Sequence, residues 1–200
     1  MPLASFDHYA ALFAAQGVRL YMVGGTSRDY LLGLPVRDFD FVSSAVPEKT
    51  LEILGEGDAT FAKYGTISLR KEGFCADFMT FRKESGYLDS RHPACIEFVD
   101  DIRLDAARRD FTINAIYIDS DYKIHDFYHG QEDLKNGVIR FIGDPDQRIQ
   151  EDPLRILRAE RFARRLGFAI EPLSLAAIER GRPLLAKLNP EKIKMESKKE

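Results

Sequence analysis

The sequence has few cysteines, no long hydrophobic run and no signal for export. It contains two cysteines, Cys75 and Cys95. Neither lies in a Cys-x-x-Cys pair, so we expect reduced thiols and no zinc site. No apolar run approaches the ~18 residues that a membrane-spanning helix needs, and the N-terminus lacks the basic start and short apolar core of a secretory signal. These absences predict a cytoplasmic protein that does not interact with membranes.

Positive charge is also scarce overall, but it is concentrated in two stretches. The formal net charge is −3, which argues against a surface built entirely for nucleic acid. Arginines gather in residues 103–111 and 155–165. A charge run of this kind is as often a solvated helix face as a binding surface.

Apolar periodicity predicts an α+β fold, and 200 residues suffice for one domain and the start of a second. The pattern predicts strands over 19–25, 37–44, 65–71, 75–82, 95–100 and 112–119, helices up to Gly17 and over 26–33 and 48–55, and a polar loop over 83–93. From about Asp144 onward, apolar residues recur every three or four positions, so the rest is expected to be helical. Pro145 and Pro153 are helix-start signals.

The stretch "VGGTSRD" and the following "DFD" form the first chemical constellation. Gly24 and Gly25 follow a predicted strand, where backbone N–H groups can approach a phosphate closely, and Arg28 lies one turn into the next helix. Asp38 and Asp40 are two residues apart in a predicted strand, so their carboxylates point to one face. Paired carboxylates beside a phosphate cradle suit two Mg²⁺ ions, which take oxygen ligands from protein and phosphates together. Each feature alone is more often structural, but together they are far more specific.

Asp77 is a candidate third carboxylate. It lies on the predicted strand over 75–82, where it would share the metal face or would be an ordinary solvent-exposed aspartate at a sheet edge. Spacing does not separate these alternatives. The four histidines are scattered, and we assign none of them a catalytic role.

Four motifs, in order, resemble those of class II tRNA nucleotidyltransferases (CCA-adding enzymes) and bacterial poly(A) polymerases: "VGGTSRDYLLG…RDFDFV", "RRDFTINAIYID", "GDPDQRIQEDPLRILRAERFARRLGF" and "PEKIKMESKKE". The resemblance implies a nucleotidyltransferase palm, with a mixed sheet of about five strands and flanking helices, followed by the start of an all-helical neck. We therefore place the palm at 1–144 and the neck at 145–200. Members of this family continue for about as long again, so we expect the neck to be incomplete or followed by body and tail domains outside this sequence.

The resemblance also implies roles for individual residues. Asp38 and Asp40 match the metal-binding catalytic aspartates, and Asp77 stands where many relatives have glutamate. The nucleotide-binding positions are Gly24, Gly25 and Arg28 for the triphosphate, Arg108, Arg109, Asp110 and Asn114 for the ribose and phosphates, Asp152 and Arg155 for the base, and Arg158 and Arg161 for further phosphate contacts.

The base-reading assignment agrees with elementary chemistry. Asp152 and Arg155 are three residues apart at a predicted helix start, hence on one face. An aspartate accepts from an exocyclic amino group and an arginine donates to a ring nitrogen, which fits cytosine and adenine but not uracil or guanine. The alternative is a helix-capping aspartate with an i+3 salt bridge.

These features predict template-independent addition of C and A to the 3′ end of tRNA, from CTP and ATP, with Mg²⁺ as cofactor and pyrophosphate as product. Two alternatives stay open. One is a poly(A) polymerase, or a CC-only or A-only adding enzyme, of the same family. The other is a non-catalytic RNA-binding scaffold. The sequence does not tell whether the protein has protein partners.

Overall fold

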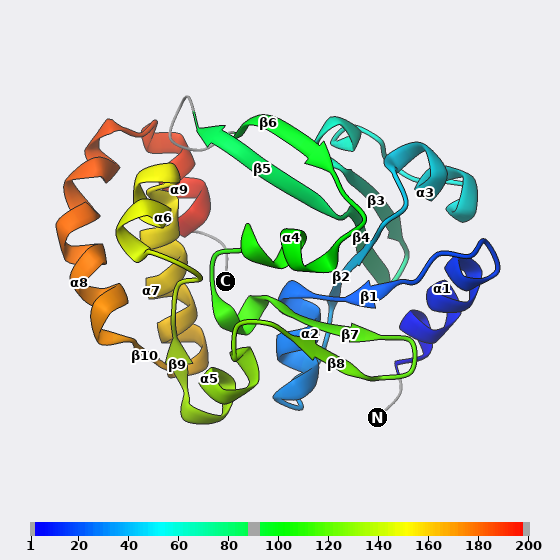
Figure 1. The fold of residues 1–200 in the computed structure, drawn as a ribbon, viewed down its shortest axis with the longest axis horizontal. Helices are drawn as coiled ribbons and strands as arrows, with labels where there is room; N and C mark the ends of the chain where they lie inside the picture. Colours follow the sequence, from blue (N-terminus) through cyan, green and yellow to red (C-terminus); the bar gives the residue numbers. More distant parts are fainter. Residues whose placement is uncertain (1–2, 88–92, 198–200) are drawn as a thin grey trace.

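The computed structural model describes residues 3–87 and 93–197, with a mixed sheet on one side of the molecule and a group of helices on the other (Figure 1). The helices are α1 (Ala4–Ala14), α2 (Gly24–Leu31), α3 (Pro47–Leu54), α4 (Ile102–Ala107), α5 (Gly130–Asn136), α6 (Pro145–Glu151), α7 (Leu154–Leu166), α8 (Pro172–Gly181) and α9 (Pro190–Ser197), with 3-10 turns η1 (Ala62–Tyr64), η2 (Thr112–Asn114) and η3 (Arg182–Lys187). In the described part of the chain, no helix is both long and apolar enough to span a lipid bilayer.

The main sheet has six strands in the order β3-β4-β2-β1-β7-β8. Its strands are β1 (Tyr21–Met22), β2 (Asp38–Ser43), β3 (Thr66–Lys71), β4 (Phe74–Thr80), β7 (Ile116–Asp119) and β8 (Ile124–Asp126). Only the β2–β4 pair is parallel within it, and the register places Asp40 opposite Asp77. A separate hairpin of β5 (Arg82–Tyr87) and β6 (Pro93–Phe98) arches above α4 (Figure 1).

Side-chain alternation along β2 separates an apolar face from a functional face. Phe39 and Phe41 belong to the core formed with α1, α3 and part of α2, in which Phe41 is fully buried. Val42 points to the opposite face, where it packs in a smaller cluster with Ala106 of α4 and with Tyr117. Successive strand residues face opposite sides, so Asp38 and Asp40 lie on the α4 face, as the spacing predicts.

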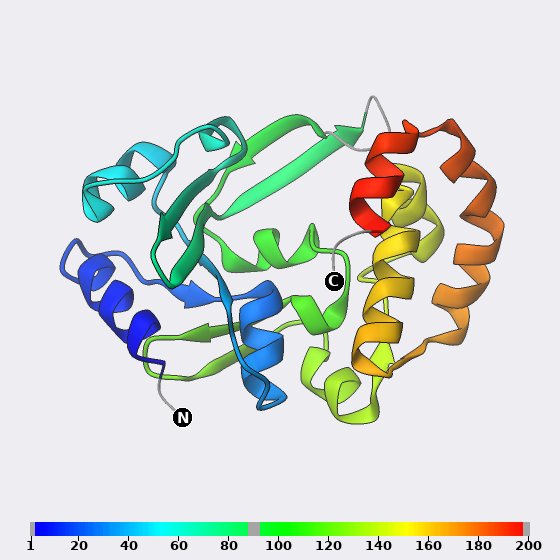
Figure 2. The same ribbon diagram turned by 180° about the vertical axis from the view of Figure 1, so that it is seen from behind.

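The helical part is joined to the sheet part by a shared core. Phe111 and Phe141 pack in one cluster with Phe162 of α7. The short strands β9 (Val138–Ile139) and β10 (Ala169–Ile170) pair in parallel across the same junction. Figure 2 shows α9 folded back along α7 on this side of the molecule. The division of the chain at residue 145 therefore stays a prediction, since the core continues across it.

Several predicted boundaries were wrong. The helix predicted over 26–33 begins at Gly24, so both glycines lie in its first turn. The loop predicted over 83–93 contains most of β5 and the first residue of β6, and its residues 88–92 lie outside the described part. The strand predicted over 112–119 begins with the 3-10 turn η2. Helices α4 and α5 and strands β8, β9 and β10 were not predicted.

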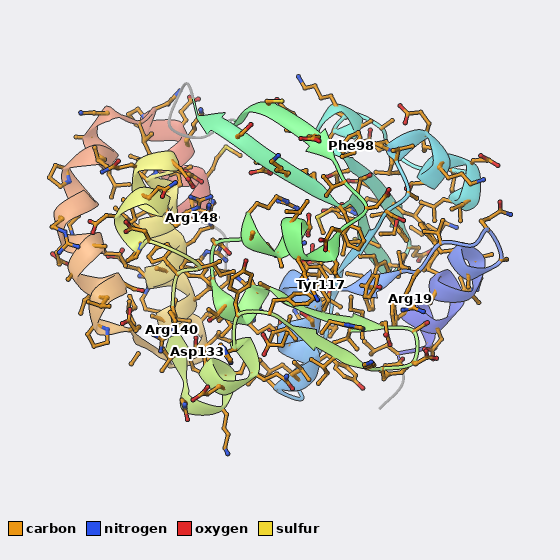
Figure 3. The ribbon with its side chains drawn as sticks, viewed as in Figure 1. Arg19, Phe98, Tyr117, Asp133, Arg140 and Arg148 are labelled. Atoms are coloured by element: carbon orange, nitrogen blue, oxygen red, sulfur yellow. The ribbon has the colours of Figure 1, made fainter. Side chains whose placement is uncertain are left out.

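Asp133 of α5 forms polar contacts that stabilise the junction between the sheet and the helices. It is 5% exposed, accepts the Thr112 hydroxyl at 2.6 Å and pairs with Arg140 Nε at 3.0 Å. Arg140 also faces Glu171, at the start of α8, at 3.7 Å. Figure 3 shows Asp133 and Arg140 beside each other at this junction.

Asp133→Ala is expected to lower the free energy of unfolding by about 1–3 kcal/mol, because it leaves the buried Thr112 hydroxyl without its acceptor and removes the nearer carboxylate partner of Arg140. Urea denaturation followed by circular dichroism measures the change. Glu132→Ala is the matched control, since Glu132 is the exposed neighbouring carboxylate of the same helix. Equal effects of the two substitutions would contradict the role assigned to Asp133.

Candidate active site

The site begins where α2 meets β2. The Gly25 N–H donates to Asp40 Oδ2 at 3.1 Å, and Thr26 Oγ1 accepts from the Asp40 N–H at 2.6 Å. Gly24 has a φ of +64°, and a Cβ there would lie 3.0 Å from Asp40 Oδ2. A glycine is therefore needed at position 24 both for its backbone conformation and for the close approach of the carboxylate.

The other two candidate carboxylates differ in their surroundings. Asp38 is exposed, and its carboxylate forms no hydrogen bond or ion pair with another residue in the described part of the chain. Asp77 lies on the same face as Asp40 but its Oδ1 accepts from Ser68 Oγ and from Arg70 Nη2, both at 2.7 Å. A metal role for Asp77 stays a prediction; its other carboxylate oxygen, Oδ2, makes no hydrogen bond to another residue in the described part of the chain.

Asp40 is the carboxyl of this face with a raised pKa. Burial raises the pKa of Asp40 to about 6, although the Arg109 cation and the Gly25 N–H act in the opposite direction. The nearby Asp77 charge adds to the increase. The positive groups around Asp40 therefore do not fully compensate the burial of its negative charge. A bound cation would supply the missing compensation.

Arg28 lies beneath the glycine turn. It is 2% exposed, pairs with Asp29 at 2.7 Å, donates Nη1 to Asn114 Oδ1 at 3.0 Å and stacks over the ring of Phe162 at 4.9 Å. Burial lowers the pKa of Arg28 despite the Asp29 charge. Its contact with a triphosphate stays a prediction, whereas its hold on Asn114 is direct.

A buried carboxylate that sequence reasoning missed holds the next two arginines. Asp105 of α4 has no exposed surface; its Oδ1 accepts from Arg108 Nε at 2.9 Å and its Oδ2 pairs with Arg109 Nη2 at 3.0 Å. Burial disfavours its charge, but Arg108 and Arg109 hold the pKa of Asp105 well below its usual range. The spacing of three and four residues in a helix is the sequence signal that identifies it.

Asp110 connects the sheet part to helix α7. It accepts from Asn114 Nδ2 at 3.4 Å and pairs with Arg158 Nε at 3.1 Å. Arg158 in turn pairs with Asp152 at 2.8 Å. Five predicted positions therefore form one continuous polar chain that runs from Arg28 through Asn114, Asp110 and Arg158 to Asp152.

Asp152 and Arg155 are buried at the start of α7, 6% and 4% exposed. Asp152 Oδ1 accepts the Leu154 N–H at 3.1 Å, which is a cap-like contact, while Arg155 Nη1 donates to Glu151 Oε2 at 2.8 Å. Base reading by this pair stays a prediction. Glu151 was not predicted, and its Oε2 also accepts from Arg148 Nη1 at 2.8 Å.

Arg148 of α6 is a third residue that was not predicted. Its Nη2 donates to the backbone carbonyls of Arg108 and Arg109, the latter at 2.7 Å. Arg148 therefore links the helix that precedes Asp152 to the end of α4 (Figure 3).

Arg161 lies one turn beyond Arg158, where it pairs with the buried Glu196 of α9 at 3.0 Å and stacks over Phe162.

The raised pKa of Asp40 predicts how stability depends on pH. The folded protein binds this proton more tightly than an unfolded chain, whose ordinary Asp pKa is about 3.9. Between about pH 4 and pH 7, ionisation of Asp40 therefore lowers the stability of the wild type by about 2 kcal/mol, a loss that does not occur in Asp40→Asn. We expect the stability advantage of Asp40→Asn to grow over this interval.

Urea denaturation at both pH values, without divalent cations, measures this difference. Asp38→Asn is the matched control, because Asp38 is the exposed neighbour on the same strand face. A difference between Asp40→Asn and wild type that is equal at the two pH values would contradict the burial of the Asp40 charge.

Comparison with known proteins shows the family and the fold of the chain. The poly(A) polymerase head-domain family matches residues 20–140. The CCA-adding enzyme of Ligilactobacillus salivarius is 43% identical over 180 residues, 90% of this chain and 45% of that protein. The crystal structure of the Bacillus stearothermophilus CCA-adding enzyme in complex with CTP superposes with a TM-score of 0.86 and 35% identity, over 95% of this chain and 46% of that chain. The Thermotoga maritima CCA-adding enzyme complexed with tRNA gives a TM-score of 0.76 at 28% identity, over 96% and 45%.

This chain spans about half the length of the curated relatives that it matches. The family match nevertheless covers the glycine turn, both aspartates of β2, and the arginines after α4. The chain therefore belongs to the poly(A) polymerase head-domain family.

Proposed function

We propose that this chain carries the nucleotidyl-transfer centre of a CCA-adding enzyme, which adds C and A from CTP and ATP to the 3′ end of tRNA. The observation that carries the proposal is the placement of Asp38 and Asp40 on one strand face beside a glycine turn. Arg109 supplies positive charge to the same place. The relatives described with CTP and with tRNA support the substrate classes.

The residues at this face fit a Mg²⁺ site. In residues 3–87 and 93–197, no group of three or more His, Cys, Asp or Glu side chains is arranged to hold a metal. Mg²⁺ characteristically takes one or two carboxylates and completes its shell with water and substrate phosphates. Asp38 is exposed and unpaired in the described chain, and Asp40 is a carboxylate short of positive charge, so this pair supplies the oxygen ligands that such a site needs.

Bound Mg²⁺ supplies charge neutralisation at the triphosphate and activates the attacking hydroxyl. The chain's own residues orient the substrates. The first turn of α2 and the cation of Arg109 face the phosphates, while Asn114 is held by Arg28 and Asp110 at the position proposed for the ribose. The 3′ hydroxyl of the RNA loses its proton to solvent as its oxygen forms a bond to the α-phosphorus, and the bond from that phosphorus to the oxygen that bridges it to the β-phosphate breaks to release pyrophosphate.

Base choice is assigned to Asp152 and Arg155. Both side chains are buried and held by neighbours, so a base with the wrong pattern would leave polar groups unpaired. Such a mismatch costs roughly 1–3 kcal/mol per group. Cytosine and adenine share the amino group and ring nitrogen that this pair complements.

Incubation with tRNA that lacks its CCA end, Mg²⁺ and each nucleotide separately tests the proposal. We expect addition of two C residues from CTP, and of one A when ATP follows. A long A tail from ATP alone would instead support a poly(A) polymerase, the second candidate that the matched family's name favours. No incorporation by the wild type would contradict both.

Asp152→Asn is expected to relax base selectivity, because the amide keeps an acceptor for the Leu154 N–H but loses the charge that the base amino group meets. The use of UTP and GTP relative to CTP should rise at least about fivefold. Competition assays with all four nucleotides measure the ratio. Asp144→Asn, at the cap of α6, is the control and should leave the ratio unchanged; an unchanged ratio in Asp152→Asn would reduce Asp152 to a helix cap.

A further inference from the structure

The arginines Arg108 and Arg109 are adjacent in sequence but differ in which nitrogens remain available. Arg108 uses all three guanidinium nitrogens, since Nε and Nη2 contact Asp105 and Nη1 donates to Glu84 at 3.2 Å. Arg109 uses Nε and Nη2, but its Nη1 donates no hydrogen bond to another residue in the described part of the chain. Of these two arginines, only Arg109 therefore has a guanidinium nitrogen without a hydrogen bond to the described protein, and this nitrogen can donate to a ligand.

Two buried groups fix the direction of that open nitrogen. Asp105 Oδ2 accepts from Arg109 Nε and Nη2 at 3.2 and 3.0 Å. The Tyr117 hydroxyl accepts from Arg109 Nε at 2.8 Å and donates to the same Asp105 oxygen at 2.6 Å. The guanidinium of Arg109 also lies over the Tyr117 ring, 5.2 Å from its centroid.

Tyr117 is held in place by the packing around its ring. It is fully buried on β7, and its ring contacts Tyr21, Phe81 and Phe127. Figure 3 shows it at the centre of the molecule, where the sheet meets α4. A buried hydroxyl on a strand thus closes a three-membered ring of hydrogen bonds with Asp105 and Arg109.

We infer that Tyr117 and Asp105 are positioning residues that aim the free Nη1 of Arg109 at the phosphates of the bound nucleotide. This inference rests on the proposed function. Preorganised donors bind an anion better than mobile ones, since the cost of orienting them has already been met in folding. Removal of the Tyr117 hydroxyl should therefore weaken binding through Arg109, with the fold retained.

The test is a double-mutant cycle on CTP binding with Mg²⁺, measured by isothermal titration calorimetry. Tyr117→Phe should raise the dissociation constant of CTP about 3- to 10-fold. Arg109→Ala should raise it at least as much, and Tyr117→Phe should add nothing in the Arg109→Ala background, because the hydroxyl acts through the guanidinium. Binding of CMP, which lacks the two outer phosphates, should be much less affected by Tyr117→Phe.

Tyr21→Phe is the matched control. Tyr21 belongs to the same aromatic cluster and touches the Tyr117 ring, but its hydroxyl makes no hydrogen bond to another described residue. Its CTP affinity should equal that of the wild type, and thermal unfolding of every variant shows that each is folded. Unchanged CTP affinity in Tyr117→Phe, or an equal loss in both Arg109 backgrounds, would overturn the inference. A wild type that fails to bind CTP would overturn the proposed function as well.

Discussion

The contact between the Asp40 carboxylate and the first turn of α2 determines the arrangement of the site. A Gly25 N–H at 3.1 Å and a Gly24 backbone with positive φ allow the carboxylate to lie against the helix start. A helix N-terminus favours negative charge. The helix that starts there carries Arg28 inward to Asn114, and the strand that carries Asp40 leaves Asp38 exposed beside it.

Buried charge is the second constraint, and the buried and half-buried arginines of the site have carboxylate partners. Arg28 pairs with Asp29, Arg158 with Asp110 and Asp152, and Arg161 with Glu196. Pairing of this kind is costly to break, because removal of one partner leaves the other charge unsolvated. Specific arginines are thus held in place although the chain as a whole carries a net charge of −3.

The sequence predicts the parts of the fold in which apolar spacing is regular. Strand β2 and the helices α3, α6, α7 and α8 follow it closely. Most of β6 falls in the strand predicted over 95–100, but β5 was missed because its polar residues resemble a loop, and α4 was missed because it is only six residues long.

For the site, the motifs predict which residues matter but not which of them are buried. The backbone N–H groups of the glycine turn were expected to lie close to a phosphate. In the fold, the Gly25 N–H instead donates to the Asp40 carboxylate. Arg28 was expected to face the triphosphate, yet it is 2% exposed because Asp29, Asn114 and Phe162 surround it. Such burial depends on contacts between segments 86 residues apart, which local spacing does not encode.

The most direct test of the account is a single-turnover measurement of CMP transfer to tRNA without its CCA end, at saturating CTP and Mg²⁺. The wild type is compared with Asp38→Asn and Asp40→Asn, each shown to be folded. The account predicts that either substitution lowers the rate by at least about 1,000-fold, equivalent to about 4 kcal/mol of transition-state stabilisation. A rate within a few-fold of the wild type in either variant would contradict the assignment of this strand face as the catalytic centre.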